Sequence, residues 1–422
     1  MTSLHHLIDL EWMCEAYDLT RKDGAPGVDG VTADDYEANL EANLTDLLER
    51  IKSGRYVAPP VRRRFIPKAD GALRPLGIPT LEDKVAQRAI LMLLEPIYET
   101  DFLPCSYGFW PGRSAHEALH ALRGGFMEQG LRWVVDVDIS KYFDTIDHGC
   151  LRKFLDQRVT DGVVRRMIDK WLKAGVLEKG VLRRTTGGTP QGGVISPLLS
   201  NIYLHHVLDE WFETVARPRL KGRCQLVRYA DDAVMAFEDH LSGKRMLAVL
   251  GKRLERFGLT LHPTKTRFVD FRFKRPQGRH LATTATTFDF LGFTHVWGKS
   301  LKGKDVVRQI TAKDRYARAL AAVSAPTKSA PSVPRAARSS VTDDPGALRL
   351  LRHLRPRQED QMVSPPGRAD FEKMARSSRT PQQAVVAALP RHARATPVAA
   401  SLDRSFVRRP MSKARARRTG CG

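Results

Sequence analysis

The chain has 422 residues, of which 42% are hydrophobic, enough to bury a substantial core and to exclude a wholly disordered protein. Its 69 Lys and Arg against 47 Asp and Glu give a net charge of +22, which predicts an anionic partner, above all a nucleic acid. The five scattered cysteines are never spaced as CxxC, and no leader or long apolar run stands out. These features predict a protein of the reducing cytoplasm, without disulfides, structural zinc or a membrane partner.

The basic charge gathers toward the C-terminal end. Residues 324–422 hold 20 Lys and Arg against 7 Asp and Glu, so 13 of the 22 net positive charges lie there. This stretch lacks Trp and Tyr and begins with SAPTKSAPSVPRAARSS, a composition that buries too little apolar surface to offset its ordering entropy. We therefore expect a globular part that ends near Val323, followed by a low-complexity and largely disordered tail.

Two local patterns lie upstream of the acidic motifs. RRRFIPKADGALRPLGIP (62–79) predicts two strands joined by a turn that contains Asp-Gly. TLEDKVAQRAILMLLEPIYE (80–99) predicts a helix, because Thr80 and Asp83 form a capping signal and apolar residues recur from Val85 to Ile97 along one face.

Acidic residues then interrupt two apolar segments. In WVVDVDIS (133–140), alternation predicts a strand with one apolar face and a second face that carries Asp136 and Asp138. In QLVRYADDAVMAF (225–237), Asp231 and Asp232 fall at the tip of a probable hairpin. Two carboxylates about 4 Å apart repel by roughly 4 kcal/mol at a near-surface dielectric, so solvent, protonation or a cation must offset the cost.

Pairing of these two segments would bring Asp136 or Asp138 close to Asp231 and Asp232. Three converging carboxylates suit hard divalent cations with oxygen ligands, Mg²⁺ above all. Two such ions could orient an attacking hydroxyl and neutralise a leaving oxygen in phosphoryl transfer.

An ordered series of motifs spans about two thirds of the chain. It runs from GAPGVDGVT (24–32) through DVDISKYFDTIDH, GGTPQGGVISPLLSNIYLHHVLD, VRYADDAV and GLTLHPTKT to FLGFTHVWGK (290–299). This series resembles the reverse transcriptases encoded by bacterial group II introns, which are also called intron maturases.

The resemblance implies that Asp138, Asp231 and Asp232 are the catalytic residues and the ligands of two Mg²⁺ ions, with Mn²⁺ as a possible substitute. It favours Asp138 over Asp136, which is then a supporting or solvated carboxylate. Phe143 matches an aromatic wall that excludes the ribose 2′-hydroxyl; an ordinary core Phe is the alternative.

Further nucleotide contacts follow from the same resemblance. Lys68 and Arg74 match positions that reach the incoming triphosphate, although on a hairpin alone they would be solvated surface residues. Gln191 and Gly192 match a loop where the backbone approaches template and nucleotide. Lys265 matches a lysine near the leaving pyrophosphate, with a solvated lysine as the alternative.

Two smaller expectations concern local structure. Ser196 and Pro197 are predicted as the N-cap and the first residue of a helix. Trp110 stands where the family usually has Arg, which puts a nucleic-acid backbone contact there in doubt.

The implied fold class is α+β, the fingers and palm of a right-hand polymerase, with an antiparallel palm sheet packed on helices. We expect an N-terminal extension and fingers over 1–130 and a palm over 131–300, with 180–200 contributing to the fingers or template loop. Residues 301–323 would end the palm and start the thumb, and residues 324–422 would form the basic tail.

Nothing in residues 324–422 resembles the helical thumb of the family. ALRLLRHLRPRQEDQMVSPPGR can be back-translated so that a shifted frame reads like a thumb, which suggests a frameshift near codon 324. The competing interpretation is a basic arm that binds RNA through its charge. Without a thumb we expect little processive synthesis.

The leading functional prediction is an RNA-directed DNA polymerase that adds deoxynucleotides to a DNA primer on an intron RNA template, with a maturase role in splicing and retrohoming. The alternatives are an RNA-binding splicing maturase without processive synthesis and an inactive relic. A DNA endonuclease is not expected, because no arrangement of paired Cys and His follows Phe293. A homodimer stays an open possibility.

Overall fold

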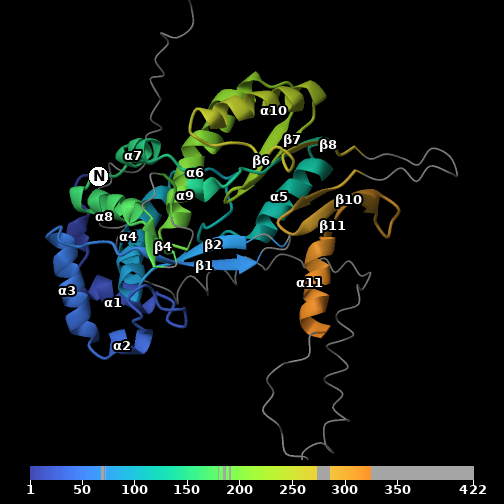
Figure 1. Ribbon diagram of the computed structural model, residues 1–422. Coiled ribbons are helices and arrows are strands. Elements are labelled where there is room, and N and C mark those ends of the chain that lie inside the picture. Colours follow the sequence, from blue (N-terminus) through green and yellow to red (C-terminus); the bar gives the residue numbers. More distant parts are fainter. Residues whose placement is uncertain are drawn as a thin grey trace, which may run out of the picture. The chain divides into compact units, whose positions relative to one another are not determined.

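The computed structural model describes residues 1–67, 71, 73–178, 180–183, 187–189, 192–272 and 286–324 (Figure 1). The helices are α1 Leu10–Asp18, α2 Ala33–Glu37, α3 Leu40–Lys52, α4 Leu81–Glu99, α5 Ala115–Met127, α6 Tyr142–Thr145, α7 His148–Asp156, α8 Gly162–Lys173, α9 Ser196–Leu204, α10 His240–Glu255 and α11 Lys313–Ser324. The strands are β1 Val61–Pro67, β2 Leu73–Ile78, β3 Trp133–Val137, β4 Val176–Glu178, β5 Val181–Arg183, β6 Cys224–Tyr229, β7 Asp232–Phe237, β8 Arg267–Asp270, β9 Phe288–Phe290, β10 Phe293–Lys299 and β11 Asp305–Thr311. The α+β class is confirmed.

The central sheet has the order β6-β7-β3-β8 and is antiparallel throughout. One face packs on α10, where the Trp133 ring lies 4.4 Å from that of His240. The same ring lies 5.8 Å from that of Phe268 on the neighbouring strand β8. The other face packs on α5, where Val134 is buried together with Leu122. Both faces of β3 are therefore apolar at its start, and the prediction of one apolar and one acidic face is correct only toward Asp136 and Asp138.

A second sheet contains the predicted hairpin. β1 and β2 pair antiparallel, with Arg62 opposite Ile78 and Ile66 opposite Arg74, which confirms the two strands. β4 then pairs parallel to β1, and β5 pairs with β4, so the order is β2-β1-β4-β5. This parallel addition was not predicted, because three-residue strands carry little periodicity.

The third sheet has the order β11-β10-β9 and follows the central sheet along the chain. Its strands β9 and β10 are joined at Leu291 and Gly292, which both have positive φ. β11 contacts α5. The predicted tail over 324–422 lies outside the described residues from 325 onward.

The two predicted helix starts are only partly correct. The Thr80 hydroxyl accepts a hydrogen bond from the Asp83 amide at 3.1 Å, as expected for an N-cap. At α9 the N-cap is Ile195, and Ser196 is already the first helical residue. The predicted N-cap was therefore wrong by one position.

Asp83 of α4 is the acceptor in a buried hydrogen-bond network. Its carboxylate accepts hydrogen bonds from Trp171 Nε1 at 2.7 Å, from Gln87 Nε2 at 2.9 Å and from the Tyr56 hydroxyl. Gln87 Oε1 in turn accepts from the Ile195 amide at 3.2 Å. The network thus connects α4 and α8 to the loop that leads into α9.

This network predicts a measurable pH dependence of stability. Burial raises the pKa of Asp83 to about 6, against the opposing effect of its hydrogen bonds. Because the folded chain holds this proton more tightly than the unfolded chain, the free energy of unfolding should fall by about 2–3 kcal/mol between about pH 4 and pH 6. Urea unfolding should show that contribution in the wild type and not in Asp83→Asn. An identical pH slope in both proteins would contradict it.

Across the described residues, no helix combines the length and the apolar character that crossing a bilayer requires.

Candidate active site

The strand register brings the three predicted catalytic acids together. Asp232 begins β7 directly after the two-residue turn of Ala230 and Asp231, and Tyr229 pairs with Asp232 across the hairpin. On the other side of β7, Ala233 pairs with Val137. Asp138, the next residue after Val137, therefore lies opposite Asp232 at the same end of the sheet.

The electrostatics of the cluster agree with this geometry. Burial raises the pKa of Asp232 to about 6, and the neighbouring charges of Asp231, Asp138 and Asp136 contribute to the rise. The pKa of Asp231 is also raised, first by burial and further by Asp138, while Arg74 opposes the shift. The carboxylates thus repel one another, as the sequence predicted.

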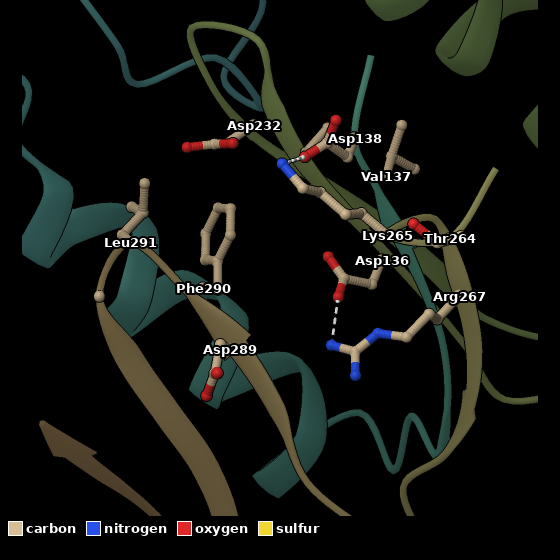
Figure 2. A pocket seen from close by; sticks show the side chains of 12 residues that line it. Asp136, Val137, Asp138, Asp232, Thr264, Lys265, Arg267, Asp289, Phe290 and Leu291 are labelled. Atoms are coloured by element: carbon tan, nitrogen blue, oxygen red, sulfur yellow. Dashed lines mark hydrogen bonds and ion pairs between the residues drawn. The ribbon is translucent and has the colours of Figure 1, made fainter. Parts of the chain in front are cut away.

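A cavity of about 380 Å³ opens beside these acids. Its walls come from Asp136–Asp138 of β3 and the segment after it, from Asp232–Ala233 of β7, from the segment that carries Lys265, and from residues 289–292 (Figure 2). The carboxylates of Asp138 and Asp232 line this cavity, whereas Asp231 is not among its lining residues.

Asp136 of β3 and Asp138, which follows this strand, each form an ion pair with a different basic residue. Lys265 Nζ lies 3.5 Å from Asp138 Oδ2, so the predicted lysine does reach the acidic cluster (Figure 2). Arg267 Nη2 lies 2.9 Å from Asp136 Oδ2, on the side of the cavity away from Asp232. Both acids are therefore ion-paired, and the preference for Asp138 over Asp136 as a ligand stays a prediction.

The backbone around Asp138 explains the position of Lys265. The Asp138 carbonyl accepts hydrogen bonds from the His262 amide at 2.8 Å and from the Thr266 hydroxyl at 3.1 Å. Ile139 also forms a β-bridge with Leu261. The segment HPTKT is thereby held along the strand extension, with Lys265 between its two anchoring residues.

The donor set fits divalent cations. The cluster offers carboxylate oxygens from Asp138, Asp231 and Asp232, the ligand type that Mg²⁺ prefers. Desolvation, and after it the charges of Asp231, Asp138 and Asp136, raise the pKa of Asp232, and Arg74 only partly opposes this rise. A bound cation would compensate the charge of these carboxylates.

The structure describes some of the residues that were predicted to contact the nucleotide. The charge of Arg74 on β2 lies close enough to Asp231 and Asp232 to lower the pKa of both. Phe143 is half-buried, and its carbonyl accepts a hydrogen bond from the Thr189 amide at 2.7 Å, so its role in sugar selection stays a prediction. Lys68 and Gln191 lie outside the described residues.

Gly192 requires glycine for a reason that the sequence did not indicate. Its φ is +112°, and a Cβ there would lie 2.3 Å from the carbonyl oxygen of Gly77 on β2. The loop before α9 is therefore in backbone contact with the fingers hairpin.

The Trp110 side chain contacts two other side chains of this chain. Its ring lies 5.6 Å from that of Phe102, and the guanidinium of Arg113 lies 4.4 Å from the Trp110 ring. A basic group thus remains beside the position where the family has Arg.

Sequence reasoning missed one wall of the cavity. Asp289, Phe290, Leu291 and Gly292 line it at the turn between β9 and β10. The alternation in FDFLGF (288–293) is typical of a strand that ends in a turn, a signal that could have been used, but nothing local indicates that this turn faces Asp138.

A cluster of acids suited to divalent cations, next to a basic hairpin, is typical of proteins that carry out phosphoryl transfer on nucleic acids. Residues 66–295, more than half of the chain, match the family described as reverse transcriptase (RNA-dependent DNA polymerase). The chain belongs to the reverse transcriptase family. Domains of this family generally use divalent metal ions and act on nucleic acids, with RNA as template.

Several curated proteins are similar to the chain. Protein YkfC of Escherichia coli is 41% identical over 256 residues, a match that covers 53% of this chain and 67% of YkfC. The group II intron-encoded protein LtrA of Lactococcus lactis is 42% identical over 179 residues, covering 42% of this chain and 30% of LtrA. Nuclear intron maturase 2 of Arabidopsis thaliana is 30% identical over 173 residues, covering 32% of this chain and 23% of the maturase. The predicted kinship with group II intron reverse transcriptases is confirmed, although the chain spans less than a third of LtrA.

Proposed function

We propose that this chain copies RNA into DNA by adding deoxynucleotides to a primer 3′-hydroxyl, as a reverse transcriptase of a group II intron. The observation that carries the proposal is the meeting of Asp138, Asp231 and Asp232 at one end of the palm sheet, in a chain of the reverse transcriptase family. The substrates would be an intron RNA template, a DNA primer and deoxynucleoside triphosphates.

Asp138, Asp231 and Asp232 would hold the divalent cations, and we propose Mg²⁺ as the physiological ion and Mn²⁺ as a substitute. When bound, such ions lower the pKa of the attacking hydroxyl and neutralise charge on the phosphoryl and leaving oxygens. Arg74 would orient the triphosphate from the fingers hairpin. Lys265 would leave Asp138 and donate a proton to the departing pyrophosphate.

Phe143 would select the sugar, and Gly192 would keep the template loop against the hairpin. Lys68 and Gln191 are proposed as further nucleotide contacts on the strength of the motifs alone. We also propose the division into fingers over 1–130, palm over 131–300 and the start of a thumb over 301–323.

A second role is supported by the similarity to an intron maturase and by the basic charge of the chain. In this role the protein would bind its intron RNA and stabilise a form competent for splicing. The charge favours phosphate contacts that weaken as salt is added.

The direct test of the proposed function is primer extension by the full chain. An oligo(dT) primer on poly(rA), with dTTP and Mg²⁺, should be extended by at least a few nucleotides, and EDTA should stop the reaction. A folded chain that extends no primer with either Mg²⁺ or Mn²⁺ would refute DNA synthesis and leave the RNA-binding role.

A further inference from the structure

Arg228 is a charged side chain with 0% exposure in the core of the palm. Its guanidinium donates to both oxygens of Asp209, at 2.7 Å from Nε and 2.5 Å from Nη2. It also donates to Ser106 Oγ at 2.8 Å, to Asn201 Oδ1 at 3.0 Å and to the carbonyl of Ala230 at 2.9 Å. All five guanidinium hydrogens therefore have partners, and these come from four separate parts of the chain.

The bond to Ala230 reaches the catalytic turn itself. Ala230 immediately precedes Asp231 and has a φ of +57°, in the left-handed region that residues with a Cβ seldom adopt. Such a conformation persists only where the surroundings hold it. Arg228 fixes the Ala230 carbonyl and so the direction in which Asp231 leaves the turn.

A second contact supports the same turn from the other side. A Cβ on Gly108 would lie 2.3 Å from the Ala230 amide nitrogen, so the two backbones touch. The carbonyl of Gly108 accepts a hydrogen bond from Asn201 Nδ2 at 2.6 Å, and Arg228 donates to the oxygen of the same amide. Asn201, Gly108 and Arg228 therefore enclose the turn as one hydrogen-bonded assembly.

We propose that the buried Arg228–Asp209 pair is a positioning device for the metal-binding carboxylates, which sets the catalytic turn through the Ala230 carbonyl. This inference rests on the proposed function of the acids and adds residues that do not touch substrate. Asp209 contributes to this positioning because its negative charge allows the Arg228 guanidinium to be buried beside the turn.

Stability alone explains this arrangement poorly. A buried ion pair is often no more stabilising than apolar residues of similar volume, because burying both charges costs desolvation energy. The guanidinium could pair with Asp209 alone, yet it also donates a hydrogen bond to the Ala230 carbonyl. The charge of Arg228 also lowers the pKa of Asp231, so it lies within electrostatic reach of that acid.

The test is the double variant R228M/D209L, which removes both charges together and keeps the core filled. We expect it to fold, with a thermal midpoint close to that of the wild type. The kcat for dTTP addition on primed poly(rA) should fall about 100-fold, while KM for dTTP stays within about threefold. Mn²⁺ binding, measured by calorimetry without nucleic acid, should weaken about tenfold, because the carboxylates no longer converge.

A second variant and a control keep the test decisive. R228K preserves the pair with Asp209 but lacks the planar fork that also reaches Ala230, so it should show the same loss of kcat and of Mn²⁺ affinity. Asp161→Asn disturbs a carboxylate of 0% exposure that accepts from the amides of Leu4, Val163 and Val164, far from the turn in sequence, and should leave both readouts unchanged.

The outcomes separate the two hypotheses. Wild-type kcat and Mn²⁺ affinity in a folded R228M/D209L or R228K protein would overturn the positioning role. Inactivity of the wild type would count against the proposed function instead, and the comparison of Mn²⁺ affinities would still decide the role of Arg228.

Discussion

Replacing Asp231 by alanine should reduce the rate of DNA synthesis by at least about 1,000-fold while the protein stays folded. Asp231 sits at the hairpin tip, in electrostatic contact with Asp232 and Asp138, and its carboxylate is one of the three that would share the cations. Its removal relieves repulsion among neighbouring acids, so the thermal midpoint without metal should stay the same or rise. Single-nucleotide addition on primed poly(rA) and a thermal melt measure the two effects.

Asp34→Ala is the matched control for this variant, because Asp34 is an exposed acid on α2 with no part in the palm. It should retain wild-type activity. Asp231→Ala should still bind intron RNA and assist splicing, since those roles need charge and shape and no metal chemistry. Retention of more than a tenth of the wild-type synthesis rate would remove Asp231 from the catalytic set.

Replacing Phe143 by alanine should raise the incorporation of ribonucleotides relative to deoxynucleotides by about 100-fold, a change of about 2.7 kcal/mol in discrimination. A ring at this position would collide with a 2′-hydroxyl, and discrimination by a clash is lost when the ring is removed. The ring is well held: Tyr142 beside it is buried and donates to the Ser200 carbonyl at 2.7 Å, and Thr189 bonds to the Phe143 carbonyl.

The ratio of kcat/KM for dTTP and UTP on the same primed template measures this selectivity. Tyr142→Phe serves as the control, because it keeps the neighbouring ring and loses only its hydroxyl, so its selectivity should equal that of the wild type. An unchanged ratio in Phe143→Ala would show that the sugar is selected by another residue.

The acidic site could be predicted because its signals are local. Alternation placed Asp136 and Asp138 on one face of a strand, and it placed Asp231 and Asp232 at the tip of a hairpin. A one-residue error of register would have moved Asp138 to the opposite face. The hairpin that carries Arg74 was likewise evident from its strand–turn–strand pattern.

What could not be predicted depends on contacts between distant residues. Arg228 looked like one more residue in an alternating strand, and its partners Ser106, Asn201 and Asp209 are 122, 27 and 19 positions away. The strand pairing of β4 with β1 and the approach of Gly192 to Gly77 are equally non-local. The wrong N-cap at Ser196 was a smaller error, since helix ends are uncertain by a residue or two.

The bracketing of Asp138 by His262 and Thr266 has a consequence for what moves during catalysis. His262 and Thr266 hold the backbone on both sides of Lys265 against the Asp138 carbonyl, whereas the Lys265 side chain is half-exposed and free to rotate. In the proposed proton transfer the ammonium would therefore move alone, and the backbone of Asp138 would keep its position while the by-product leaves.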